Sequence, residues 1–106
     1  MGAASVLDAL GHPTRRAILE ELAAGPLPVG VLAGRLPISR PATSQHLRVL
    51  KAAALVSETT RGTRHEYAID HAGLRAVQAY LDRFWGDALD RFAALAETEA
   101  RSEGDP

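Results

Sequence analysis

The 106-residue sequence contains no cysteine. This absence excludes disulfide bonds, thiolate metal ligands, iron–sulfur clusters and cysteine nucleophiles, and it allows a reducing, intracellular compartment. The sequence also has no run of about 18 apolar residues, and its first six residues lack the basic segment of a signal peptide. We therefore expect a cytoplasmic protein without a membrane anchor.

Net charge is nearly absent as well, because the formal value is only −1. Taken alone, this value argues against a nucleic-acid partner. The basic residues are concentrated, however: the segment from Arg35 to Arg64 has six basic residues and a single acid, Glu58, whereas residues 71–106 have four basic and seven acidic residues. A polyanion would be attracted to the first segment and repelled by the second.

The length of the chain predicts one small domain. Glycine and proline residues divide the sequence into five stretches with helical spacing and one with strand alternation. The expected fold is mainly α with a small β-hairpin, in the order helix, helix, helix, helix, hairpin, helix. We assign residues 1–97 to this domain and expect residues 98–106 to form a disordered acidic tail.

The fourth expected helix, which begins after Ser39, carries the first functional signal. Ser39 suits an N-cap, and Pro41 is tolerated in a first turn. The inward-facing residues are spaced by four, three and four positions: Thr43, Leu47, Leu50 and Ala54. The remaining faces present small, hydrogen-bonding or cationic groups: Pro41, Ser44, Gln45, His46, Arg48, Lys51 and Ala52. The helix contains no acid, which is typical of a helix lying between phosphates in a DNA groove; the alternative is an ordinary solvated face.

A β-hairpin is predicted directly after this helix. Residues 56–60 and 63–69 alternate as strands do, and they are joined by a turn at Arg61 and Gly62. The tip places the guanidinium groups of Arg61 and Arg64 beside a glycine that can adopt positive φ. A helix pair followed by a hairpin with a basic tip indicates a winged helix-turn-helix, although such a hairpin could instead only cover the core.

Three segments resemble the ArsR/SmtB-type winged-helix transcriptional regulators of bacteria: residues 10–19 (LGHPTRRAIL), residues 39–50 (SRPATSQHLRVL) and residues 61–67 (RGTRHEY). The resemblance extends over nearly the whole chain and implies sequence-specific binding to double-stranded DNA. It implies base contacts from Ser44 and Gln45, and phosphate contacts near the fourth helix and in the hairpin. The complete set of candidate DNA-binding residues is Arg40, Thr43, Ser44, Gln45, His46, Arg48, Arg61 and Arg64.

Two positions depart from the family pattern. The family usually has glycine at the position of Ala54 and often an acid at the position of Val31. An alanine in a left-handed C-cap costs roughly 1 kcal/mol, so we expect either strain at Ala54 or a different helix ending.

The closing helix predicts a partner subunit. Its apolar residues recur at spacings of three and four over a length greater than a small domain needs to cover its own core. With the first helix, it would form the two-helix dimer interface that the resemblance implies; the alternative is that it packs only on its own domain. The candidate interface residues are Val6, Leu7, Leu10, Leu74, Val77, Leu81, Phe84, Trp85, Ala88 and Phe92.

Metal sensing and catalysis are both rejected. The chain resembles a cysteine-free branch of the family, and the closing helix offers Asp87 and Asp90 with His71 only at its start, so no metal ligand set is expected and no cofactor. Ser44 and His46 are two positions apart on a helix and point away from each other, so they cannot form a nucleophile and base pair. There is also no phosphate-binding glycine loop, and the protein is therefore not expected to be an enzyme.

These features together predict a homodimeric regulator, most simply a repressor, that binds a palindromic operator and is released by a small-molecule effector that the sequence does not identify. The alternative is a winged-helix module that uses the same surfaces to bind a protein and does not bind DNA specifically.

Overall fold

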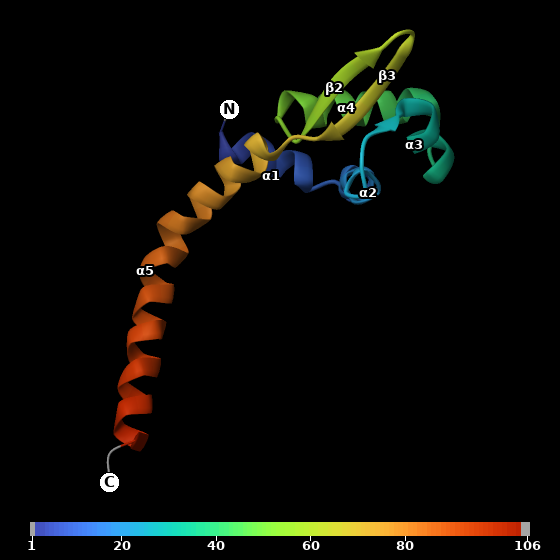
Figure 1. Cartoon of the computed structure of the whole chain (residues 1–106). Helices are drawn as coiled ribbons and strands as arrows, with labels where there is room; N and C mark the ends of the chain where they lie inside the picture. The colour runs from blue at the N-terminus through green and yellow to red at the C-terminus, as the bar shows by residue number, and fades with distance from the viewer. Residues whose placement is uncertain (1, 105–106) are drawn as a thin grey trace.

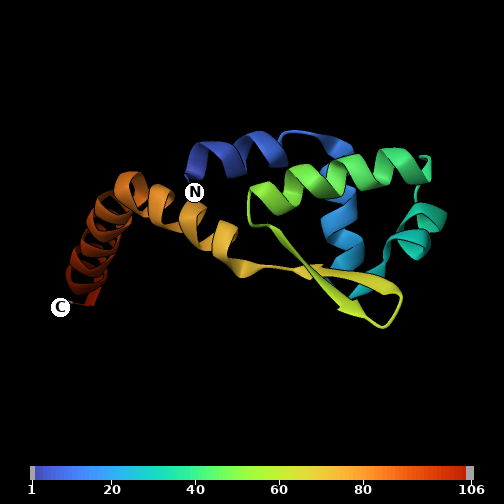
Figure 2. The same ribbon diagram turned by 90° about the horizontal axis from the view of Figure 1, so that it is seen from above.

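The computed structural model describes residues 2–104. Its elements follow the expected order, with one additional short strand: α1 (Ala3–Leu10), α2 (Pro13–Leu22), β1 (Leu27–Pro28), α3 (Val29–Arg35), α4 (Arg40–Ala52), β2 (Val56–Arg61), β3 (Arg64–Ile69) and α5 (His71–Gly104). The predicted winged helix-turn-helix is confirmed: α3 and α4 form the helix-turn-helix, and the β2–β3 hairpin forms the wing (Figures 1 and 2). Within the described residues, no helix is both long and apolar enough to cross a membrane.

The wing belongs to a three-stranded antiparallel sheet in the order β1-β3-β2. Strand β1 contains only two residues, and Leu27 pairs with Tyr67 of β3. The sequence did not predict β1, because a strand of two residues, of which the second is Pro28, is too short to show strand alternation. This pairing attaches the beginning of α3 to the wing.

The core is formed where α1, α2, α3 and α4 meet beneath the sheet. Ile18, Leu32, Leu47 and Leu50 are completely buried there, together with Leu55 at the end of α4. Helix α2 runs across α4, and Figure 2 shows α1 and α4 lying beside each other above it. The side of α4 that carries Leu47 and Leu50 is thereby fixed against the domain, which leaves its opposite side exposed.

Helix α4 ends in a left-handed residue, as the sequence indicated. Ala54 has φ of 52° and is the one non-glycine residue with positive φ among those described. The N–H of Ala54 donates to the carbonyl of Lys51 at 3.0 Å, and the N–H of Leu55 donates to that of Leu50 at 2.9 Å. These two bonds define a Schellman motif whose left-handed position is normally glycine, so the strained ending is the one that occurs.

Helix α5 begins in close contact with this ending. The N–H of Gly73 donates to the carbonyl of Ala54 at 2.9 Å. A Cβ at Gly73 would lie 2.6 Å from the carbonyl oxygen of Ala53, so only glycine allows the two helices to meet this closely. The first turns of α5 pack on α1, and the rest of the helix extends far from the domain (Figure 1).

Two sequence expectations are corrected by the fold. Residues 98–104 continue α5 as helix, so the expected disorder does not apply to them; residues 105 and 106 lie outside the described residues. Val6, expected at the dimer interface, is 0% exposed in the single chain, because it packs in the core with Ala9. The last two turns of α5, which are rich in charged residues, and the inward-facing valine of α1 both depend on geometry that periodicity does not specify.

Candidate nucleic-acid interface

Local hydrogen bonds fix the start of α4, the helix expected to read DNA. The Ser39 hydroxyl accepts a hydrogen bond from the N–H of Ala42 at 3.2 Å, which makes Ser39 the N-cap. Pro41 stands in the first turn, where its missing N–H costs nothing. The Thr43 hydroxyl donates to the Ser39 carbonyl oxygen at 2.9 Å.

The exposed side of α4 carries most of the residues predicted to contact DNA. Arg40, Gln45 and Arg48 are exposed, whereas Ser44 and His46 are half-buried at the flanks. Thr43 is 0% exposed and faces the core, so its predicted contact with DNA is wrong. Its position in the inward seam with Leu47 already indicated this burial.

His46 lies at a junction with the α1–α2 corner that the sequence did not reveal. Its ring is 4.7 Å from the ring of His12, measured between centroids. Burial, followed by the neighbouring His12 and Arg15, lowers the pKa of His46. The neutral form of His46 is therefore favoured in the free protein.

Basic side chains at this corner are used within the fold. Arg15 Nε donates to the carbonyl of Ala9 at 2.7 Å, and Arg16 donates to that of Leu10 at 2.7 Å. Both guanidinium groups therefore satisfy carbonyl groups at the end of α1, where cations are favoured. His12 caps α2 by accepting from the N–H of Thr14 at 3.2 Å.

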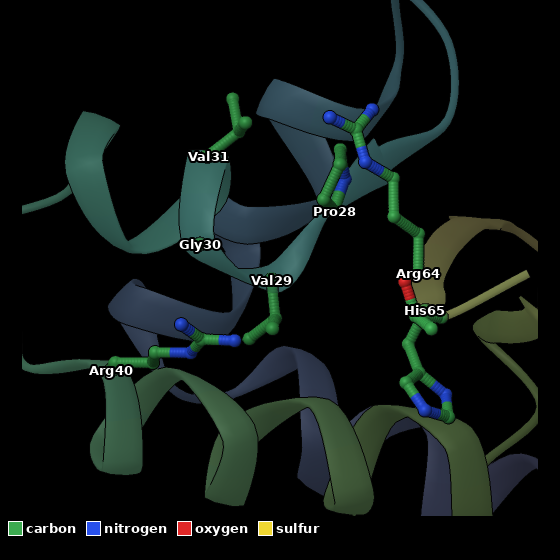
Figure 3. A pocket seen from close by; sticks show the side chains of 8 residues that line it. Pro28, Val29, Gly30, Val31, Arg40, Arg64 and His65 are labelled. Carbon is green, nitrogen blue, oxygen red and sulfur yellow. The ribbon is translucent and has the colours of Figure 1, made fainter.

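The wing presents its two arginines differently. Gly62 at the tip has φ of 64°, which a turn of two residues requires. Arg61 forms an ion pair with Glu66 at 3.7 Å, whereas Arg64 extends from the wing toward Pro28 (Figure 3). Among the described residues, no acidic side chain pairs with Arg40, Arg48 or Arg64.

Helix α4 and the wing meet at one cleft. A hollow of about 330 Å³ is lined by Arg40 from the start of α4, by Thr63, Arg64 and His65 from the wing, and by residues 28–31 around the start of α3. Figure 3 shows the side chains of Arg40 and Arg64 entering it from two different elements. The structure thus brings together two cations that the sequence places more than twenty residues apart.

A single carboxylate joins the far end of α4 to the wing. Glu58 accepts a hydrogen bond from Lys51 Nζ at 3.0 Å through one oxygen, and its other oxygen lies 2.7 Å from His65 Nδ1. The hydrogen bond from Lys51 is the main cause that lowers the pKa of Glu58, and His65 adds to it. The sequence did not assign a role to Glu58 or Lys51, because their contact spans a helix and a strand.

The residues weighed for metal binding do not gather. Among the side chains that the structure describes, in residues 2–101, no three His, Asp or Glu groups are placed to hold a metal ion. Asp87 and Asp90 are exposed near the middle of α5, and His71 is the first residue of that helix.

Comparisons with known proteins agree with this geometry. Residues 10–59, which span α2 to β2, match a family described as "Helix-turn-helix domain". The chain is 56% identical to the HTH-type transcriptional regulator Rv2034 of Mycobacterium tuberculosis over 87% of this chain and 86% of that protein. The chain belongs to the ArsR/SmtB-type winged-helix transcriptional regulators.

Two solved structures of this family extend the comparison. An ArsR-like transcriptional regulator from Rhodococcus sp. RHA1 is 35% identical, with a TM-score of 0.74 over 91% of both chains. The homodimeric winged helix-turn-helix DNA-binding domain of Mb0332 from Mycobacterium bovis, a possible ArsR-family regulator, is 31% identical, with a TM-score of 0.62 over 86% of this chain and 76% of that one. Like these relatives, this ArsR/SmtB-type chain is therefore a transcriptional regulator rather than an enzyme.

Proposed function

We propose that this ArsR/SmtB-type regulator is a homodimeric repressor that binds a palindromic operator. The observation that carries the proposal is the exposed, acid-free side of α4, next to a wing whose Arg64 shares a cleft with Arg40. A helix of this kind fits the major groove, and the wing grips the adjacent backbone. Such a role would place the protein with the chromosome, in the bacterial cytoplasm.

Within α4, different side chains have different tasks. Gln45 is exposed at the centre of the helix and can form a bidentate contact with an adenine edge. Ser44 lies at the flank as a second, shorter hydrogen-bonding group. Arg48 and Arg64 supply cations for phosphates, which give affinity and orientation but no sequence information.

The dimer interface is proposed on α5. Beyond the first turns, its apolar side chains stand in solvent in the single chain: Phe84 is 62% exposed, Trp85 58% and Phe92 71%. Leu89 and Leu95, which were not among the interface candidates, are exposed on the same helix. A soluble domain rarely leaves such a patch uncovered, and the homodimeric Mb0332 domain supports a second copy as the cover. Leu10 and Val77 instead pack against the core of their own chain.

Repression would follow from occupancy, because a dimer that bridges two half-sites covers the DNA between them. Release of the DNA requires an effector that binds more tightly to a dimer whose spacing does not match the half-sites than to the dimer that fits the operator. The contact between α1 and α5 couples the proposed interface to the domain that holds α4.

DNA from immediately upstream of the gene for this protein tests the proposal. The purified protein should retard a palindrome from this region at low salt and release it as salt rises. Arg64→Ala should weaken the complex, whereas Arg101→Ala, which removes an exposed arginine near the far end of α5, should not. Binding that is insensitive to salt or to Arg64 would favour the protein-interaction alternative.

A further inference from the structure

Glu58 is an unusual residue for a surface that binds a polyanion. It is the only acid between Arg35 and Arg64, and it lies on β2 at the base of the wing. Its side chain is 22% exposed, so it is not simply a solvated charge. A carboxylate in this position lowers DNA affinity by repelling phosphates, and its presence therefore requires an explanation.

Both oxygens of this carboxylate are occupied by groups from different elements. Lys51 Nζ at the end of α4 lies 3.0 Å from Oε2, and His65 Nδ1 of β3 lies 2.7 Å from Oε1. His65 is a diagonal cross-strand neighbour, because Glu58 pairs with Tyr67 and Thr60 pairs with His65. The strand partner thus anchors the carboxylate, and the anchored carboxylate holds the lysine.

Folding stability does not account for this arrangement. The side chains of Lys51 and His65 are 55% and 56% exposed, and exposed ion pairs contribute little to stability. The ion pair has a larger effect on the charge of Lys51, which is the last cation of α4. This charge is neutralised by Glu58 instead of by a phosphate.

We propose that Glu58 is a positioning residue that holds Lys51 away from the DNA backbone and thereby limits sequence-independent affinity. The inference rests on the proposed DNA surface of α4 and deepens it. A lysine is a flexible point charge that binds any phosphate within reach, so its capture removes affinity that carries no sequence information. Glu58 would act on specificity without touching DNA.

The test uses a random-sequence duplex about three helical turns long and compares wild type with Glu58→Gln, Lys51→Gln and the double variant. Glu58→Gln preserves shape and removes the charge, so it should release Lys51 to a phosphate. The slope of log affinity against log salt should then steepen by about 0.9 per subunit, which is about a threefold greater loss of affinity per subunit over a fourfold rise in salt. Circular dichroism should show the same helix content in all four proteins.

The Lys51→Gln variants separate release of the lysine from simple loss of a negative charge. Lys51→Gln alone should leave the slope at the wild-type value, and the double variant should match Lys51→Gln. A lower salt slope for Lys51→Gln alone would show that Lys51 already contacts a phosphate in the wild type. An equal change of the slope by Glu58→Gln with and without Lys51 would show that only the lost negative charge matters. Either result overturns the inference. If the wild type itself showed no salt-dependent binding, the proposed DNA function would fail as well.

Discussion

The left-handed ending of α4 allows a sharp test of the backbone reasoning. Ala54 has φ of 52°, whereas its neighbour Ala53 has φ of −87° and ψ of 4°. Both methyl groups are buried, with 7% and 3% of each residue exposed. The substitutions Ala54→Gly and Ala53→Gly therefore remove the same group from nearly the same environment, and they differ chiefly in the backbone conformation at the site.

The expected difference in the free energy of unfolding follows from the one contribution that the two variants do not share. Both lose a buried methyl group, and both add glycine entropy to the unfolded chain. Only Ala54→Gly also relieves a left-handed alanine, which is worth about 1–2 kcal/mol. The free energy of unfolding of Ala54→Gly should therefore exceed that of Ala53→Gly by about 1–2 kcal/mol.

Urea unfolding followed by circular dichroism measures this difference, with similar slopes expected for both variants. Thermal unfolding should agree, with a higher Tm for Ala54→Gly by roughly 4–8 °C for each kcal/mol. Equal destabilisation by the two substitutions would refute the claim that Ala54 is strained, and with it the assignment of a Schellman motif at the end of α4.

Two further predictions concern α5 and His46. Phe84→Ala combined with Trp85→Ala should give a folded monomer in sedimentation, because both rings are exposed in the single chain. Affinity for the operator should fall toward the non-specific level of roughly 10⁻⁴ to 10⁻⁶ M. A double variant that remained a dimer and bound the operator as the wild type does would place the interface elsewhere. The pKa of His46 is depressed in the folded chain, whereas histidine in the unfolded chain titrates at about pH 6.5. Near this pH the folded chain therefore binds fewer protons than the unfolded chain, and the free energy of unfolding falls as the pH drops. His46→Gln should therefore lose less unfolding free energy than the wild type between about pH 7.5 and about pH 5.5, and parallel curves in urea titrations would contradict the depressed pKa.

The sequence predicted those parts of the fold that depend on local pattern. The 4-3 spacing of Thr43, Leu47 and Leu50 identifies the buried side of α4, and the capping residue Ser39 marks where the helix begins. The same pattern placed Thr43 on the buried side of α4, which conflicts with its prediction as a DNA contact. Burial in the structure shows that the periodicity was the better guide.

Tertiary contacts explain what the sequence did not predict. The partners of Arg15 are carbonyl groups at the end of α1, and the partners of Glu58 come from α4 and β3. Such contacts depend on how elements cross, and a local pattern does not encode that geometry. For the same reason, β1 is recognised as a strand only from its pairing with β3.

The most direct test of the central claim measures Gln45→Ala and Arg64→Ala on the operator and on single-base variants of it, over a series of salt concentrations. Gln45→Ala should relax discrimination at one position in each half-site by about 1–3 kcal/mol and leave the salt slope unchanged. Arg64→Ala should weaken all sequences alike and reduce the salt slope by about 1 per subunit. If both substitutions caused the same loss on every sequence, α4 would not be reading bases and the account of this protein as a sequence-specific regulator would be contradicted.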